Sequence, residues 1–299
     1  IILMESTMIE TNPLVTVIIP TYHDWPRLSA CLDALKMQSY SASLIEIFVV
    51  NNDPQDTPPP MELAENVTIL AESKPGSYAA RNLGLSRANG KLIFFTDSDC
   101  KPASDWIESA VTIFNASPEV KRIAGRVKVF SAHETFKLVE LYDSVFAFQQ
   151  ADYVESGFAV TANLIARREC FELIGPFNSD LMSGGDVEWN LRATEEGLTM
   201  RYYDNVMVQH PARDTLKELL IKAKRVAGGR YKKERSEAIK WSFTRGILPP
   251  VGAYKTIVHA KLQSTKNTVI LFFLFYMLKV YTSINIWLLA LNLAQPSRK

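Results

Sequence analysis

The segment Phe94-Phe95-Thr96-Asp97-Ser98-Asp99 ends an apolar stretch, residues 91–96, that the sequence predicts to be a buried strand. Residues two apart in a strand point to the same side, so Asp97 and Asp99 repel each other unless a cation lies between them. Carboxylate oxygens suit Mg²⁺ or Mn²⁺, particularly where substrate phosphates supply the remaining ligands. The segment therefore predicts a metal-assisted reaction on a phosphorylated substrate. The alternative is structural, with Asp99 or Ser104 capping a helix that begins near Ala103.

Strands alternate with helices before this segment, which is typical of a parallel sheet covered on both faces. The expected strands are 14–19, 44–50 and 67–70, and the expected helices are 25–37 and 77–88. Ligands bind beyond the carboxyl ends of the strands in such sheets. The polar residues that follow those ends are Thr21 and Tyr22, then Asn51, Asn52 and Asp53, then Asp97, Ser98 and Asp99. We expect these three groups to converge on one crevice.

The pattern changes after Pro118, and the tail differs again. We expect strands at 122–130, 158–166, 199–203 and 206–209, and helices at 134–150, 168–174, 186–196 and 215–233. The predicted organisation is an N-terminal extension over 1–12, an α/β domain over 13–235 with halves at 13–118 and 119–235, and a helical segment over 236–299.

Composition limits the class of protein. Of the 299 residues, 47% are hydrophobic and 22% are charged, as expected for a folded protein with a sizeable core. The net charge of +1 provides no global field that would favour nucleic acid as a partner. Three cysteines that lie far apart indicate reduced thiols in a cytosolic compartment, and we expect no secretory signal at the N-terminus.

A second candidate site is the sequence Gly184-Gly185-Asp186-Val187-Glu188-Trp189. The glycines allow close approach of the backbone to a ligand and place Asp186 at a helix N-terminus, where the helix dipole favours its ionised form. A carboxylate held there could take a proton from a hydroxyl nucleophile. The same pattern is also what an ordinary helix cap would give, with Glu188 in the first turn.

Three cationic features are weaker signals. Arg81 lies on an early turn of the helix after Lys74-Pro75-Gly76 and could bind phosphate, or it could belong to a solvated surface helix. His210 could be a metal ligand or a structural residue. The basic residues from Lys222 to Arg235 flank Gly228-Gly229 and could bind pyrophosphate or lipid headgroups, although a solvated helix face is the simpler interpretation.

The tail contains an apolar stretch, residues 268–291, that would be roughly 36 Å long as one helix and long enough to span a bilayer. Lys279 interrupts it and would be costly at the centre of a membrane. An in-plane helix, a re-entrant hairpin and a contact between two copies of the chain remain open. We expect membrane association, because ten consecutive apolar residues leave no polar face for solvent.

Together these motifs resemble the family 2 glycosyltransferases, whose nucleotide-sugar fold is called GT-A. The matching residues are Val17-Ile18-Ile19-Pro20-Thr21-Tyr22, Val49-Val50-Asn51-Asn52-Asp53, Ala80-Arg81-Asn82-Leu83-Gly84, Ala88-Asn89-Gly90, Phe95-Thr96-Asp97-Ser98-Asp99 and Gly185-Asp186. Their order and spacing cover about residues 14 to 215.

The resemblance implies inverting transfer of a sugar from a nucleoside-diphosphate sugar to an acceptor hydroxyl. It assigns Mn²⁺ or Mg²⁺ to Asp97, Asp99 and His210, and the general base to Asp186, with Glu188 in reserve. It places the donor against Pro20, Thr21, Tyr22, Asn51, Asn52, Asp53, Arg81, Asp97 and Ser98. The expected acceptor is a glycan or a lipid-linked molecule, and the expected location is the cytoplasmic face of a membrane.

The chain departs from the family pattern in two places. Asn51 and Asn52 stand where acidic residues are frequent, and Gly185 stands where Glu often precedes the base. The Q-x-x-R-W signature of processive synthases is absent, which favours addition of one sugar. The rival hypotheses are a nucleotidyltransferase, which would usually have a glycine-rich loop after the first strand, and a sugar-nucleotide-binding protein without activity.

Overall fold

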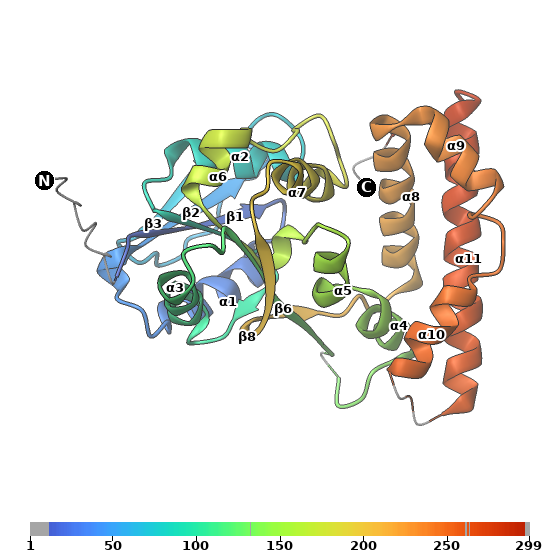
Figure 1. Cartoon of the computed structure of the whole chain (residues 1–299), viewed down its shortest axis with the longest axis horizontal. Coiled ribbons are helices and arrows are strands. Elements are labelled where there is room, and N and C mark those ends of the chain that lie inside the picture. The colour runs from blue at the N-terminus through green and yellow to red at the C-terminus, as the bar shows by residue number, and fades with distance from the viewer. Residues whose placement is uncertain (1–11, 132, 261, 263, 297–299) are drawn as a thin grey trace, which may run out of the picture.

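The computed structural model describes residues 12–131, 133–260, 262 and 264–296. The expected extension over 1–12 therefore lies almost wholly outside the described residues. Within them, one eight-stranded sheet has the order β3-β2-β1-β4-β7-β6-β8-β5, with helices on both faces (Figure 1).

The first half of the sheet is parallel, as the sequence predicts. It consists of β1 (Val15–Thr21), β2 (Ile45–Asn51), β3 (Val67–Ala71) and β4 (Leu92–Phe95). Side chains alternate between two buried clusters: Val17 and Ile19 belong to one and Ile18 to the other. The period of two in a strand buried on both faces explains why this part of the sequence is continuously apolar.

The second half of the sheet is mixed. It consists of β5 (Lys101–Pro102), β6 (Arg122–Phe130), β7 (Leu164–Arg167) and β8 (Met200–Pro211). Strand β7 runs antiparallel to both β4 and β6, and β5 runs antiparallel to β8, whereas β6 and β8 are parallel. Four of the seven strand pairings are thus parallel, which confirms the expected mostly parallel sheet.

Three element predictions were wrong in detail. The single helix at 134–150 is two helices, α4 (Leu138–Phe146) and α5 (Gln150–Glu155), because Phe148 has a φ of 56°, which a helix cannot contain. The strand at 158–166 is a short 3₁₀ turn, η2 (Thr161–Asn163), followed by β7. The two strands at 199–203 and 206–209 are one strand, β8, whose register against β6 shifts between Gly125 and Arg126.

The helices cover the two faces separately. Helices α1 (Trp25–Lys36) and α3 (Trp106–Ala116) pack in the first cluster, and α2 (Ser77–Arg87), α6 (Arg168–Ile174) and α7 (Gly185–Glu195) pack in the second. A short 3₁₀ turn, η1 (Ala42–Leu44), leads into β2. This arrangement leaves the carboxyl ends of β1, β2 and β4 facing the same side as the start of α2.

The last part of the chain is helical, with α8 (Leu216–Lys233), α9 (Arg235–Phe243), α10 (Val251–His259) and α11 (Thr265–Ala290). Helix α11 runs along one edge of the molecule, and α8 lies between it and the sheet (Figure 1). Its polar residues Thr282, Ser283 and Asn285 are buried against the protein, whereas Phe273 and Met277 are exposed. The polarity of α11 is therefore opposite to that of a helix on a soluble surface.

By length and composition, α11 could cross a membrane, and a third of its most apolar window is buried inside the protein. Lys279, the interruption noted in the sequence, donates from Nζ to the carbonyl of Leu248 at 3.0 Å. Tyr276 donates in the same way to the carbonyl of Ile247 at 2.7 Å. Tyr276 and Lys279 of this helix thus have partners in the loop before α10.

Candidate active site

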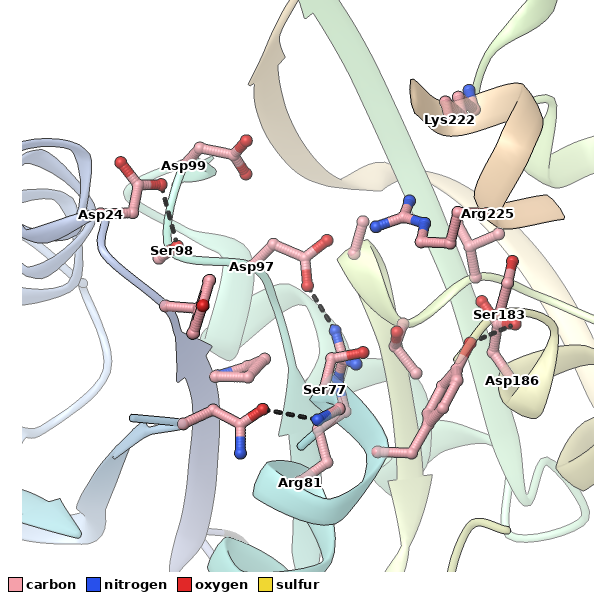
Figure 2. A pocket seen from close by; sticks show the side chains of 18 of the residues that line it. Asp24, Ser77, Arg81, Asp97, Ser98, Asp99, Ser183, Asp186, Lys222 and Arg225 are labelled. Atoms are coloured by element: carbon pink, nitrogen blue, oxygen red, sulfur yellow. Dashed lines mark hydrogen bonds and ion pairs between the residues drawn. The ribbon is translucent and has the colours of Figure 1, made fainter. Parts of the chain in front are cut away.

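A cavity of about 580 Å³ opens at the carboxyl ends of β1, β2 and β4 (Figure 2). Most of the side chains singled out in the sequence line it: Pro20, Thr21, Tyr22, Asn52, Arg81, Asp97, Ser98, Asp99, Asp186 and His210. The three polar groups that follow the strands therefore converge, as expected. Asn51, Asp53 and Glu188 are not among the residues that line the cavity.

Asp97 is held by Arg81 of α2. The guanidinium Nη2 donates to Asp97 Oδ1, and Arg81 is almost fully buried, with 3% exposed. Tyr78 lies one turn earlier on the same face of α2, and its ring is 5.7 Å from the Arg81 guanidinium carbon. Within the described part of the chain, Asp97 Oδ2 accepts no hydrogen bond, so that oxygen remains available to a ligand.

Asp99 lies beside His210, with 3.4 Å between Oδ1 and Nε2. The pairing of β5 with β8, in which Lys101 faces Gln209, brings these two residues together from distant parts of the chain. His210 Nδ1 is 2.7 Å from the Pro211 carbonyl, which can only accept. The proton of a neutral imidazole is therefore on Nδ1, and the lone pair of Nε2 points to Asp99. Arg27 Nη1 is 3.5 Å from the other carboxylate oxygen.

This pair fits a divalent cation. A carboxylate oxygen and an imidazole nitrogen with a fixed tautomer are ligands for Mn²⁺, and the Phe148 ring packs 4.4 Å from the His210 ring and fixes its orientation. Cys100 Sγ lies within 4.8 Å of both ligand atoms. Burial raises the pKa of the Cys100 thiol well above its usual range, which keeps it protonated and a poor ligand.

Asp186 is the second residue of α7, on the other side of the cavity. Its Oδ1 accepts from the Tyr78 hydroxyl at 2.9 Å and from the Val187 amide at 2.9 Å. Both of these hydrogen bonds end on Oδ1, which leaves Oδ2 to take up a proton. Burial raises the pKa of the Asp186 carboxyl, and the Tyr78 hydrogen bond opposes that rise. Such a carboxylate is a better base than an exposed aspartate.

Gly185 is explained by Tyr78. A Cβ at residue 185 would lie 2.7 Å from the Tyr78 ring, so a side chain there would displace the tyrosine that holds Asp186. Gly184 has a φ of 78°, the left-handed conformation that favours glycine. Glu188 points elsewhere and pairs with Arg192 at 2.6 Å. The structure thus separates the two carboxylates that the sequence left as base and reserve.

The loop after β2 is fixed by its asparagines. Asn52 accepts from the Gly76 amide at 2.7 Å and donates to the Lys74 carbonyl at 2.7 Å, which joins this loop to the start of α2. Asn51 donates to the Asp56 carbonyl at 2.7 Å and accepts from the Asp53 amide at 3.1 Å. Asn51 therefore fixes the shape of this loop without lining the cavity.

His23 and Thr21 complete this edge of the cavity. Asp53 lies 2.9 Å from His23, whose φ of 53° is rare for a residue with a side chain and marks strain beside the cavity. Thr21 is buried, and its hydroxyl has no hydrogen-bond partner among the described residues. A buried hydroxyl without a partner at the cavity wall suits a polar ligand.

The comparisons agree with this geometry. The sequence model described as "Glycosyl transferase family 2" matches residues 16–175. This chain belongs to that family. It is 37% identical over 231 residues to the glycosyltransferase AglE of Haloferax volcanii, with 74% of each chain covered. The protein is therefore a glycosyltransferase, and its role is in glycan synthesis.

Solved structures show the same fold. A mannosyltransferase from Pyrobaculum calidifontis, solved with GDP-Man and Mn²⁺, superposes with a TM-score of 0.61 at 18% identity, covering 94% of this chain and 87% of the other. The S. aureus TarS fragment 1–349, solved with UDP, superposes with a TM-score of 0.52 at 13% identity, covering 93% and 91%. The GT-A architecture expected from the sequence is thus confirmed.

In this glycosyltransferase, helix α8 supplies cavity residues that the sequence named only as members of a basic run, with a solvated helix face as the simpler interpretation. Lys222 and Arg225 line the cavity together with Arg213 from the preceding loop. The sequence showed a run of basic residues but not which of them share a face. The spacing of three between Lys222 and Arg225 was the available signal, because residues three apart lie on the same face of a helix. Tyr78 was missed in the same way, three residues before Arg81.

Proposed function

We propose that this glycosyltransferase moves a sugar from a nucleoside-diphosphate sugar to an acceptor hydroxyl with inversion at the anomeric carbon, in the synthesis of a polysaccharide or glycolipid. The observation that carries the proposal is the placement of Asp186 across one cavity from Asp99 (Figure 2), beside which His210 lies at 3.4 Å. A single displacement needs a base on one side of the anomeric carbon and a binding site for the leaving group on the other.

The donor fits the sheet side of the cavity. Thr21 and Tyr22 line this side, and Asn52 fixes the neighbouring loop. Arg81 and Asp97, which are paired with each other, line it as well. The fold neighbours were solved with GDP-Man and with UDP, which supports a nucleotide at this edge. Asn51 and Asp53 act on the donor through the shape of their loop, because they do not line the cavity.

A divalent cation, Mn²⁺ or Mg²⁺, would be held by Asp99 and His210, with Asp97 Oδ2 as a further ligand. When bound, it would neutralise the charge that develops on the departing diphosphate. The neighbour solved with Mn²⁺ and GDP-Man supports this assignment. Arg81 acts from the buried side, where it fixes the orientation of Asp97.

Asp186 is the proposed base. Its Oδ2 takes the proton of the acceptor hydroxyl as the acceptor oxygen attacks the anomeric carbon. The bond from that carbon to the diphosphate oxygen breaks, and its electron pair leaves with the nucleoside diphosphate. Because attack and departure occur on opposite sides of the carbon, its configuration inverts. Tyr78 keeps Asp186 oriented through this step.

We also propose that the helices beyond about residue 236 attach the enzyme to the cytoplasmic face of a membrane. The exposed apolar side chains of α11 support contact with lipid. Its buried face packs on α8, which lines the cavity, so an orientation of α11 along the membrane surface keeps α8 out of the lipid.

The test is a screen of nucleotide sugars with the full chain in mild detergent, with Mn²⁺ and with chelator, by calorimetry and by release of nucleoside diphosphate. We expect one donor to bind in a metal-dependent manner. Asp186→Asn should keep that binding and lower turnover by about 10²–10⁴-fold, the usual contribution of a general base. Turnover that persists in this variant would remove Asp186 from the role, and binding without any transfer would indicate a non-catalytic sugar-nucleotide-binding protein.

A further inference from the structure

Helix α8 is the wall between the cavity and the apolar helix α11. Leu219 and Ala223 on one face of α8 pack with Leu278 of α11. Lys222 and Arg225, on another face, line the cavity. A helix with its side chains is about 10–12 Å across, so the cavity lies about one helix diameter from α11.

The cavity side of α8 has an excess of positive charge. Arg213 Nη1 contacts both oxygens of Asp143, at 2.9 and 3.0 Å, and Lys222 Nζ is 3.8 Å from the same carboxylate. Asp143 thus faces two cations, Arg213 and Lys222, and the nearby charge of Arg225 adds to the repulsion at Lys222. Arg225 Nε is buried and has no hydrogen-bond partner among the described residues.

The state of Lys222 fits an anion site. Desolvation in the cavity and the nearby charge of Arg213 lower the pKa of Lys222 to about 8, while Asp143 opposes the shift. An anion placed between Lys222 and Arg225 would relieve this repulsion and pair with the free guanidinium donor.

The geometry of the reaction indicates which substrate supplies that anion. In Figure 2, Asp97 and Asp99 lie on one side of the cavity and Asp186 and Lys222 lie on the other, and the Arg225 side chain extends from that second side toward Asp97. In an in-line displacement the leaving diphosphate and the acceptor occupy opposite sides of the anomeric carbon, and the base is on the acceptor side. The cations of α8 are therefore on the side of the acceptor.

We propose that the acceptor is a lipid whose phosphate or diphosphate is bound by Lys222 and Arg225, with its reacting hydroxyl at Asp186 and its apolar chain in the membrane beside α11. This rests on the proposed function, because it assigns the acceptor for the same reaction. Arg213 neutralises Asp143 and leaves the two α8 cations available to the phosphate.

The test measures co-flotation of the full chain with phosphatidylcholine vesicles that contain geranylgeranyl phosphate, geranylgeraniol or phosphatidylserine. We expect the phosphate lipid to bind most tightly. Lys222→Met and Arg225→Gln should each weaken that binding by about tenfold to a hundredfold, as expected for a charged hydrogen bond. Lys217→Met, at an exposed position of α8 outside the cavity, is the matched control and should bind like the unmodified chain.

The other outcomes overturn the proposal. If vesicles with geranylgeraniol bind the chain as tightly as those with geranylgeranyl phosphate, only the apolar chain is recognised. If vesicles with phosphatidylserine bind it as tightly, and the two substitutions weaken that binding equally, the chain has a general attraction to negative membranes. Full competition by inorganic phosphate at similar concentration would mean a site for the free ion. A matching loss of Mn²⁺-dependent nucleoside diphosphate binding in both variants would assign the cations to the donor.

The two proposals fail in different ways. If the unmodified chain binds no nucleoside diphosphate with Mn²⁺ but still binds the phosphate lipid through Lys222 and Arg225, the proposed function is wrong and the lipid-phosphate site stands. Binding should also decline as the pH rises through about 8, where Lys222 loses its proton. The other charged groups that face Lys222 are Arg213, Asp143 and Arg225.

Discussion

The two sides of the cavity are built in different ways. On the sheet side, Asp97 and Asp99 follow β4 directly, and the buried strands on both sides of β4 fix where that loop lies. On the α8 side, Lys222 and Arg225 depend on how one helix packs against others. The local backbone at the end of a strand determines where the following side chains lie. The position of a side chain on a helix is determined only when the helix packs against the rest of the protein.

Helix α8 closely approaches the loop that leads to Asp186. A Cβ at Gly229 of α8 would lie 2.6 Å from the carbonyl oxygen of Ser183, in the loop that leads to Asp186. The glycine lets α8 approach the loop of the proposed base. The position of the cations and the position of the proposed base are thus coupled, while the pair of Asp99 and His210 is not part of this contact. Predictions that separate the two sides test this difference.

Asp99→Ala should have the largest effect. It removes a proposed ligand on the sheet side, and a bound metal ion supplies several kcal/mol of charge stabilisation, so turnover should fall by roughly 10³-fold. Mn²⁺-dependent binding of the nucleoside diphosphate, measured by calorimetry, should be lost. Asp33→Ala, an exposed carboxylate on α1, is the control. Unchanged metal-dependent binding in Asp99→Ala would remove the cation from this side.

Gly229→Ala should affect the other side selectively. The added methyl group cannot fit against the Ser183 carbonyl, so α8 and the loop must move apart, at a cost of about 1–3 kcal/mol in the free energy of unfolding. A misplaced base and cations should lower turnover by about 10–10²-fold, with Mn²⁺-dependent nucleotide binding kept.

The control for that variant is Gly252→Ala in α10, where a Cβ would meet no atom within 4 Å. It should change neither stability nor turnover appreciably. If Gly229→Ala also abolishes nucleotide binding, the α8 side and the sheet side of the cavity are not separable. Thermal unfolding measures the stability of both variants, and single-turnover assays measure their rate of transfer.

The sheet side could be predicted because its signals are local. A continuous apolar strand that ends in Asp97-Ser98-Asp99 gives both the fold and the residues, and parallel strands bring their carboxyl ends together. His210 needed tertiary information, since only the pairing of β5 with β8 brings it to Asp99. The sequence offered only the general capacity of histidine to bind metal and the resemblance to a family residue.

The α8 side could not be predicted for a physical reason. Neighbouring cations in the run differ in their surroundings, because Arg225 lines the cavity whereas Lys224 does not. A helical run alone does not say which face meets the protein. The break between α4 and α5 was equally hidden, since nothing in the local sequence requires the positive φ of Phe148. That conformation is sustained by its packing on His210.

Exposed apolar residues of α11 should matter for membrane binding and little for the chemistry. Phe273→Glu should lower partition into phosphatidylcholine vesicles by about tenfold, which is the order of burying one such side chain. Leu173→Glu on α6 is a matched control, because Leu173 and Phe273 are both 62% exposed. Release of nucleoside diphosphate in detergent should be unchanged in both. Equal vesicle binding of the two variants would count against lipid contact at α11.

Tyr78→Phe should have the smallest effect and tests the base itself. The substitution keeps the ring that packs on Gly185 and removes the hydrogen bond that opposes the raised pKa of Asp186. Asp186 must be ionised to act, so activity rises as the pH rises through its pKa. Without the tyrosine hydroxyl that pKa is higher still, and the acid limb of the rate profile should move to higher pH while the plateau rate remains close to that of the unmodified enzyme. A limb that stays in place or moves to lower pH would show that a group other than Asp186 controls the rate, and Asp186 would then lose the role of base.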